Sequence, residues 1–335
     1  MHVECIPHPS TFPLVTSKCS GLKDVRIGMA PGPALSKFIC TLHHLETLVV
    51  TNLNMAALSH IARLPGLRYL WLMSFPIPSF QLPAGSIPFP ALQKLEYESI
   101  EHAPRLLALL IKCALVELTI IARGSYTMPP PNTIAQQFYA ALADHCSHSS
   151  LQKLDVQKGY WTLRADQRGI CLVGEEIIRP LFSFSSLVEV SLSHPFGVDL
   201  DDAVVRKMAR AWPLIESLLL PPGLDENIAP RVTLEGIYAF AEHCPRLRRL
   251  HLAFDATVIP KIKTKGKKNA CQCSLDYLDV SDSPISKARP VAKFLSAIFP
   301  HLGMINTLYE DLDGTDTETV LTSHRRWKKV EEALW

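Results

Sequence analysis

Apolar residues recur along the chain in one six-residue pattern, apolar-x-x-apolar-x-apolar. Its copies start 22 to 36 residues apart, with a mean spacing of 28. The eleven copies begin at Leu22, Leu45, Leu67, Leu92, Leu115, Leu151, Leu187, Ile215, Leu247, Leu275 and Leu302. Because strand side chains alternate with a period of two, each copy is predicted to form a short β-strand with one buried and one exposed side.

Segments with helical periodicity lie between the copies. Apolar residues fall at i, i+3, i+4 and i+7 within residues 55–64, 134–146, 201–212, 234–244 and 291–299. A proline follows several of these segments just before the next strand pattern, where it ends a helix. Each unit is therefore one strand with one helix. A unit of this size cannot bury both elements alone, so the units are expected to stack.

The pattern and the unit length are typical of leucine-rich repeats, whose signature is L-x-x-L-x-L in about 20–29 residues. The predicted fold class is α/β, a right-handed leucine-rich-repeat solenoid shaped like a horseshoe. Parallel strands are expected on its concave face and helices on its convex face. We expect an irregular N-terminal segment at residues 1–21, about eleven repeat units at 22–309, and an acidic connector with a C-terminal helix at 310–335.

Composition narrows the function classes. The 335 residues are 47% hydrophobic and 20% charged with a formal net charge of +2, which disfavours disorder and whole-chain nucleic-acid binding. The longest apolar run, 106–111, is far shorter than the ~20 residues that cross a bilayer, and no signal-peptide pattern opens the sequence. We therefore expect an intracellular protein, cytoplasmic or nuclear, without a membrane partner. The lysine run 261–268 could be a nuclear-import or phosphate-binding patch, but we favour a solvated loop.

The nine cysteines are interpreted as reduced packing residues, because six of them hold repeat-related positions just before a strand pattern. Zinc binding by Cys271 and Cys273, or by His145, Cys146 and His148, is the alternative, but neither set has a second ligand pair at zinc-finger spacing. No hydrolase, nucleotide-loop or zinc-protease motif occurs. The sequence therefore predicts no catalytic residue, no metal and no cofactor.

Strand residues that point away from the core are the candidate contacts for a partner. If the first, fourth and sixth residues of a copy are buried, the third, fifth and seventh face the concave side. The candidates on this side are Tyr69, Trp71, Met73, Glu96, Glu98, Glu117, Arg249, His251 and Tyr277. The two longest spacings imply insertions at 122–132 and 157–169, and the second insertion adds Tyr160 and Trp161 as candidate loop contacts.

The second half of the chain resembles a known family. LSHPFGVDLDDAVVRKMARAWPLIESLLL and VTLEGIYAFAEHCPRLRRLHLAFDATVIP resemble the cysteine-containing, ribonuclease-inhibitor-like leucine-rich repeats of F-box proteins. CSLDYLDVSDSPISKARPVAKFLSAIFPHLGMINT and the tail HRRWKKVEEALW are similar to the C-terminal region of fungal F-box and leucine-rich-repeat proteins. The resemblance covers about residues 20–335. It implies a horseshoe fold, no cofactor, and a role as the substrate-selecting arm of an SCF-type ubiquitin ligase.

The sequence departs from this family at its start. Only 21 residues precede Leu22, whereas the three helices of an F-box need ~35 residues. Either an F-box that binds the ligase linker subunit is encoded upstream, or the protein is a repeat-only relative that does not recruit a ligase. In both cases we expect a non-catalytic protein–protein interaction module with a protein partner on the concave face. The alternative is a GTPase-activating or other enzyme-regulating leucine-rich-repeat protein.

Overall fold

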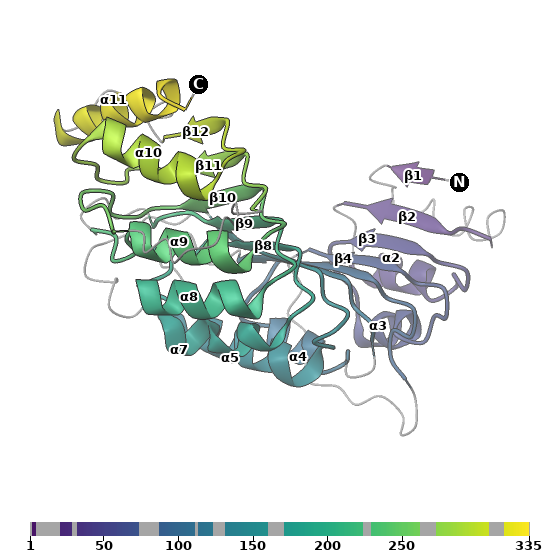
Figure 1. Cartoon of the computed structure of the whole chain (residues 1–335). Helices are drawn as coiled ribbons and strands as arrows, with labels where there is room; N and C mark the ends of the chain where they lie inside the picture. The colour runs from purple at the N-terminus through teal and green to yellow at the C-terminus, as the bar shows by residue number, and fades with distance from the viewer. Residues whose placement is uncertain are drawn as a thin grey trace. The chain divides into compact units, whose positions relative to one another are not determined.

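The computed structural model describes residues 2–4, 21–28, 32–73, 87–110, 113–122, 131–159, 171–223, 229–261, 273–307 and 318–334 (Figure 1). The chain divides into two compact units, Met1–Thr162 and Leu163–Trp335, called here unit 1 and unit 2. Each unit consists of a sheet of parallel strands and of helices that connect consecutive strands. The α/β class with parallel strands is thus confirmed, while a single continuous solenoid stays a prediction.

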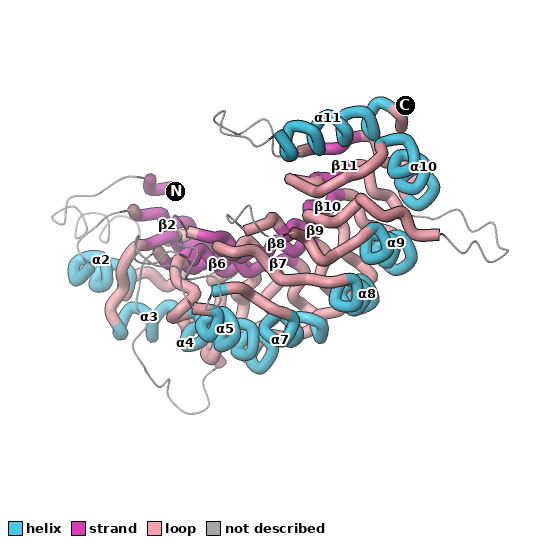
Figure 2. Tube along the Cα trace, turned by 90° about the vertical axis from the view of Figure 1, so that its left-hand side faces the viewer, coloured by secondary structure: helices cyan, strands magenta, loops and turns pink. Residues whose placement is uncertain are grey.

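In unit 1 the strands pair in the order of the sequence, and every pair is parallel. The strands are β1 (His2–Glu4), β2 (Asp24–Ile27), β3 (Thr47–Val50), β4 (Tyr69–Leu72), β5 (Lys94–Tyr97), β6 (Glu117–Ala122) and β7 (Lys153–Lys158). The helices α2 (Gly32–Ile39), α3 (Met55–Ile61), α4 (Ala103–Leu107) and α5 (Asn132–His145) lie along one face of this sheet (Figure 2).

Unit 2 repeats this arrangement. Its strands are β8 (Glu189–Leu192), β9 (Ser217–Leu220), β10 (Arg249–Leu252), β11 (Tyr277–Asp279) and β12 (Met304–Asn306), again parallel and in sequence order. Its helices are α7 (Glu175–Ile178), the 3-10 helix η3 (Arg179–Ser183), α8 (Asp202–Ala211), α9 (Leu234–His243), α10 (Ala288–Ile298) and α11 (Glu318–Glu332). The helices α7 to α10 lie on one face of the unit 2 sheet (Figure 2).

All eleven copies of the sequence pattern form strands, β2 to β12, at the predicted positions. The strand β1 was not predicted, and the expectation of an irregular segment over residues 1–21 is wrong for His2–Glu4. These three residues pair in register with Asp24–Arg26 of β2. A strand of three residues is too short to show an alternating pattern, so its pairing partner decides its conformation.

Aligned apolar side chains form the core of each unit. The fourth residues of consecutive copies are paired across the sheet, so Leu48, Leu70 and Leu95 stand in one row, each fully buried. In unit 2 Leu218, Leu250 and Leu278 form the equivalent buried row. The residue that opens each copy, leucine in ten copies and Ile215 in the other, is also buried. Stacking thus places every repeat's apolar residues against those of its neighbours.

Polar contacts between successive helices fix the spacing of the repeats in unit 2. Asp201 is the N-cap of α8, where its Oδ1 accepts a hydrogen bond of 2.9 Å from the Val204 amide. The neighbouring Asp202 instead accepts 2.7 Å hydrogen bonds from the amide and the hydroxyl of Thr233, the N-cap of α9. Gly236 permits this approach, because a Cβ there would lie 2.4 Å from Asp202 Oδ1. One aspartate therefore caps its own helix, and the next joins two repeats.

The helix α11 covers the last repeat of unit 2. Trp327 is buried, packs edge-on against Phe254 with 5.7 Å between ring centroids, and donates from Nε1 to the Ser283 carbonyl at 2.8 Å. Glu331 accepts a 3.0 Å hydrogen bond from the backbone amide of Ile305 in β12. An exposed strand edge would offer such amides to other chains, so α11 protects this edge.

Replacing Leu250 by alanine is expected to lower the free energy of unfolding by about 2–5 kcal/mol, because it opens a cavity in the fully buried row of unit 2. The exposed neighbour Arg248 provides the control, and Arg248→Ala should change stability by no more than about 0.5 kcal/mol. Urea unfolding followed by circular dichroism measures both variants. Equal stability of the two variants would contradict the assigned strand register.

Replacing Trp327 by alanine is expected to cost about 3–5 kcal/mol, because the indole fills the space between α11 and the last repeat. Amide hydrogen exchange of β12 should also accelerate, since Glu331 would no longer be held over the Ile305 amide. Lys329→Ala, on the exposed side of the same helix, is the control and should leave exchange unchanged. Unchanged exchange in the Trp327 variant would show that α11 does not stabilise this edge.

Candidate protein-binding surface

The third and fifth residues of each copy of the six-residue pattern form the surface that we call the strand face, on the side opposite the helices of each unit. Successive strands in a sheet are about 4.8 Å apart, so paired residues form rows across this face. Backbone hydrogen bonds to both neighbours hold a central strand, and its side chains need little further ordering when a partner binds. The strand faces of the two units are described in turn.

In unit 1 the strand face carries the aromatic residues predicted from the sequence. Tyr69 pairs with Thr47 and Lys94, and Trp71 pairs with Val49 and Glu96. Tyr69, Trp71 and Met73 are all partly exposed. The structure therefore brings three of the predicted contacts together on β4 and directly after it.

Charged neighbours already engage Tyr69. Its hydroxyl donates a 3.0 Å hydrogen bond to Glu96 Oε1, and the Lys94 ammonium lies 5.0 Å from the centre of its ring. Lys94 also contacts Glu96 at 3.1 Å and Glu117 at 3.6 Å. Burial, and next the hydrogen bond to Glu96, raises the pKa of the Tyr69 hydroxyl. Glu96 is thus paired with Tyr69 and Lys94, and Glu117 with Lys94, so a partner gains little from the charges of these residues.

Trp71 offers a different contact. Its ring is partly exposed, whereas its Nε1 atom is buried and has no hydrogen-bond acceptor among the residues that the structure describes. An indole with an unpaired N–H contributes chiefly apolar area to binding. Trp71 therefore remains an available apolar anchor on the strand face of unit 1.

One predicted contact lies in the core. Glu98 was expected on the concave side, but the residue is only 2% exposed, so it cannot contact a partner. The strand β5 ends at Tyr97, and the seventh position of the pattern therefore lies beyond the alternating strand. Tyr160 and Trp161, the predicted loop contacts, lie outside the described residues.

In unit 2 a row of exposed side chains crosses three strands. Arg249 of β10 pairs with Tyr277 of β11, which pairs with Met304 of β12. Arg249 is exposed, Tyr277 is partly exposed, and Met304 is 55% exposed. Arginine, tyrosine and methionine are enriched at the centres of protein interfaces. Sequence reasoning selected Arg249 and Tyr277 but missed Met304, because the last copy of the pattern is weak.

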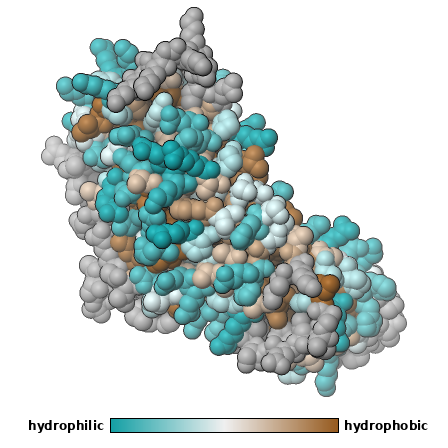
Figure 3. Space-filling view, turned by 60° about the horizontal axis from the view of Figure 1, so that its bottom comes forward, coloured by the Kyte–Doolittle hydropathy of each residue, from teal (hydrophilic) through white to brown (hydrophobic). Residues whose placement is uncertain are grey.

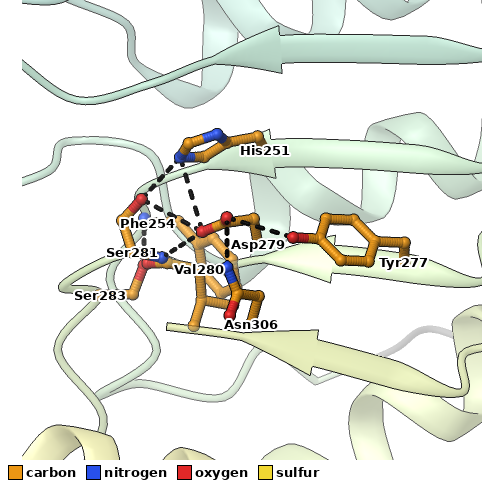
Figure 4. A network of polar contacts seen from close by, with 8 residues as sticks. All are labelled: His251, Phe254, Tyr277, Asp279, Val280, Ser281, Ser283 and Asn306. Carbon is orange, nitrogen blue, oxygen red and sulfur yellow. Dashed lines mark hydrogen bonds and ion pairs between the residues drawn. The ribbon is translucent and has the colours of Figure 1, made fainter. Parts of the chain in front are cut away.

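A buried polar network lies beside this row (Figure 4). Asp279 Oδ1 accepts hydrogen bonds from the Ser281 amide at 2.9 Å and the Ser281 hydroxyl at 3.4 Å. Asp279 Oδ2 accepts from Asn306 Nδ2 at 2.9 Å and from the Tyr277 hydroxyl at 3.5 Å. His251 Nε2 lies 2.7 Å from Ser281 Oγ and 3.5 Å from Asp279 Oδ1. The network joins three strands and holds Tyr277 and His251 in place.

The network also explains an unusual backbone conformation. Ser281 has a φ of +50°, in the left-handed region that residues other than glycine rarely adopt. The Ser281 backbone amide donates a hydrogen bond to Asp279 Oδ1, which closes a turn between residues i and i+2. Aspartate side chains commonly form this kind of turn. The Asp-Val-Ser sequence could have indicated this turn. The contribution of Asn306, 27 residues later in the chain, has no signal in the sequence.

His251, Asp279 and Ser281 include the residue types of a hydrolytic triad, but their geometry differs from one. In a catalytic triad the serine and the carboxylate contact different nitrogens of the histidine ring. Here both distances are to Nε2, and Ser281 is only 3% exposed. The arrangement therefore lacks the proton relay of a triad, and its geometry fits a structural role.

Five of the six cysteines among the described residues lie in the core. Cys113, Cys146, Cys171, Cys244 and Cys273 are buried free thiols, and Cys40 is partly exposed. Burial raises the pKa of Cys113 to about 11 and that of Cys146 and Cys244 to about 12. Cys113 and Cys273 direct their Sγ atoms at the carbonyls of Leu92 and Leu247, the first residues of the preceding copies. These thiols thus support packing between repeats.

Cys271 and all but one of the lysines of the 261–268 run lie outside the described residues.

The helices of unit 2 present a hollow lined by Glu175, Arg179, Phe182, Lys207, Arg210 and Ala211. Glu175 pairs with Lys207 at 2.7 Å and with Arg179 at 3.4 Å, so these two cations share one carboxylate, while Arg210 donates to His243 Nε2 at 3.4 Å. Hydrophilic side chains cover most of the molecular face drawn in Figure 3, with hydrophobic ones in small areas between them. The helix side therefore has the character of an ordinary solvated surface.

A cavity of about 80 Å³ lies in unit 2 beyond the carboxyl ends of β8 to β10. It is lined mainly by apolar side chains such as Phe196, Leu220 and Leu252, with the Asp199–Arg231 ion pair at 3.0 Å on its wall. Small-molecule sites usually measure about 300–1,000 Å³, so this cavity is too small for a typical ligand. The strand face remains the better candidate for function.

Comparison with known proteins adds no family: no family model and no curated protein matched the chain. In the part of the chain that the structure describes, no helix combines the length and apolar character needed to span a bilayer.

The network predicts the titration of Tyr277. Burial, and next the Asp279 carboxylate, raises the pKa of this tyrosine above its usual value, because both disfavour a phenolate. Replacing Asp279 by asparagine removes the charge and should lower the pKa of Tyr277, measured by NMR titration of ring-labelled tyrosine. Asp276→Asn, at an exposed position one residue before the strand, is the control and should leave the titration unchanged. The same pKa in wild type and Asp279→Asn would show that the carboxylate does not act on Tyr277.

Proposed function

We propose that this protein is a non-catalytic protein-interaction module built from leucine-rich repeats in a right-handed solenoid. In this proposal a protein partner binds the strand face. The module serves as the substrate-recognition part of an SCF-type ubiquitin ligase adaptor or is a repeat-only relative of one. The repeat pattern and the family resemblance of residues 20–335 support the repeat type and the adaptor role.

The exposed row Arg249–Tyr277–Met304 is the observation that carries the proposal. Interface energy concentrates in a few residues, chiefly aromatic side chains and arginine, that are well packed and rigid. The Asp279 network holds Tyr277 before any partner arrives, which reduces the entropy lost on binding. Trp71 supplies a second aromatic contact in unit 1.

Surface character favours a macromolecular partner over a small molecule. The cavity beyond β8 to β10 is small and the hollow on the helices is wide open to solvent, whereas the strand faces offer rows of side chains with a spacing set by the sheet. Leucine-rich repeats and other solenoids use such extended surfaces for binding.

Quantitative affinity purification from cells tests which side of the protein binds. Tyr277→Ala and Trp71→Ala should each weaken a true partner by about 2 kcal/mol, or roughly 30-fold in Kd, if these residues are anchors. Arg206→Ala and Lys207→Ala, on the helices, are matched controls with little expected effect. Thermal melts would first establish that all four variants fold. Loss of the partner in the helix variants, with retention in the strand variants, would refute the proposed surface.

The same purification separates the two forms of the proposal. Recovery of the ligase linker subunit with the full-length natural protein would support the adaptor form. Recovery of a substrate-like partner without the linker subunit would support the repeat-only form.

A further inference from the structure

The strand faces of the two units differ in how their charges are compensated. In unit 1, Arg26 pairs with Asp24 at 3.2 Å, and Lys94 pairs with Glu96 and Glu117. A charged partner would have to compete with these pairs. The strand face of unit 1 is therefore suited to apolar contact, through Trp71, more than to recognition of charge.

In unit 2, Arg249 has no such counter-ion. It is exposed, and no carboxylate lies within 4.0 Å of its guanidinium in the described part of the chain. The acidic residue of the paired strand β11 is Asp279, whose two oxygens accept the four hydrogen bonds described above and whose side chain is 12% exposed. Glu189 lies two strands away, at about 10 Å, which exceeds the screening length of about 8 Å at physiological salt. A cation is thus left available on this face.

Apolar contact area continues directly from this cation. Tyr277 follows Arg249 one strand further on, and Met304 follows Tyr277. The row therefore places a planar cation about 5 Å from an aromatic ring and about 10 Å from a flexible thioether. Arginine binds carboxylates through two parallel hydrogen bonds, and methionine adapts its shape to apolar side chains.

We propose that the row Arg249–Tyr277–Met304 binds an acidic, extended segment of a protein partner. This proposal rests on the proposed function and adds the chemistry of the partner. A carboxylate of the segment pairs with the Arg249 guanidinium, and an apolar side chain packs on Tyr277 and Met304. Residues i and i+2 of an extended segment point the same way and lie about 7 Å apart, which matches the distance from Arg249 to the Tyr277–Met304 pair.

The helix side of unit 2 is the competing location for an acidic segment, but three of its cations are paired with carboxylates, and the exposed Arg210 donates to His243 Nε2 at 3.4 Å. Lys207 and Arg179 pair with Glu175, and Arg206 pairs with Glu235 at 3.4 Å. An acidic segment would have to displace these carboxylates. Arg249 requires no such exchange.

A phage-displayed library of unmodified 12-residue peptides is the probe, selected on the wild-type protein at low and at physiological salt. Enriched peptides should carry Asp or Glu within four positions of a large apolar residue, most often at i and i+2. A synthetic copy of an enriched peptide should bind about 10- to 100-fold more weakly to Arg249→Ala. Its affinity should also fall as salt rises, because an exposed ion pair is screened.

Matched variants make the outcome specific. Arg246→Ala removes an exposed arginine that precedes β10 and should leave peptide binding unchanged. Met304→Ala should weaken binding less than Arg249→Ala, and the peptide with its Glu replaced by Gln should lose the salt dependence. No enrichment, enriched peptides without acidic residues, or equal binding by Arg249→Ala and wild type would each overturn the proposal.

Failure of this proposal can be told apart from failure of the proposed function. In one outcome, a cellular partner is lost with Tyr277→Ala or Trp71→Ala while the selected peptides bind Arg249→Ala as well as wild type. That combination would support the interaction module and contradict binding of an acidic segment. Failure of both strand-face variants to affect any partner would remove the proposed function itself.

Discussion

The in-register parallel pairing of short strands is the constraint on which the rest of the structure depends. Because Leu48 pairs with Leu70 and Leu70 with Leu95, one position of every repeat is committed to the core. A slip of one residue would turn these leucines outward and place polar residues inside, at a cost that no loop contact could offset. The register therefore decides which side chains face the helices and which form the strand face.

Stacked repeats must also end. In a repeat with neighbours on both sides, the backbone groups of the strand are hydrogen-bonded to both neighbouring strands. The last strand has a neighbour on one side only and exposes one row of amides. In unit 2, α11 covers this row through the buried Trp327 and the contact of Glu331 with the Ile305 amide. The tail of the sequence is therefore part of the fold, and its tryptophan joins the core that the repeats form.

The same sheet that buries the leucines gives the strand face its rigidity. Asp279 is held by donors from its own turn, from β12 and from the side chain of Tyr277, so the aromatic residue is in place before a partner binds. In unit 1 the polar residues instead pair with one another and leave Trp71 as the apolar contact. Two surfaces of the same architecture thus offer different chemistry, because the residues at the third and fifth positions are free to vary.

Residue spacing alone predicts the eleven strands, a helical segment between several of them, and the alternation that puts Tyr69 and Trp71 on the strand face of unit 1 and Arg249 and Tyr277 on that of unit 2. Period-two and period-3.6 patterns report local geometry directly, so these elements follow from residue spacing. Other features follow only from contacts between segments that are far apart in the chain. The β1 strand depends on its pairing with β2, the burial of Glu98 depends on where β5 ends, and Asp279 contacts residues 27 and 28 positions away, Asn306 and His251. Contacts of this kind depend on how segments distant in the sequence pack in space, and residue spacing along the chain does not predict that packing.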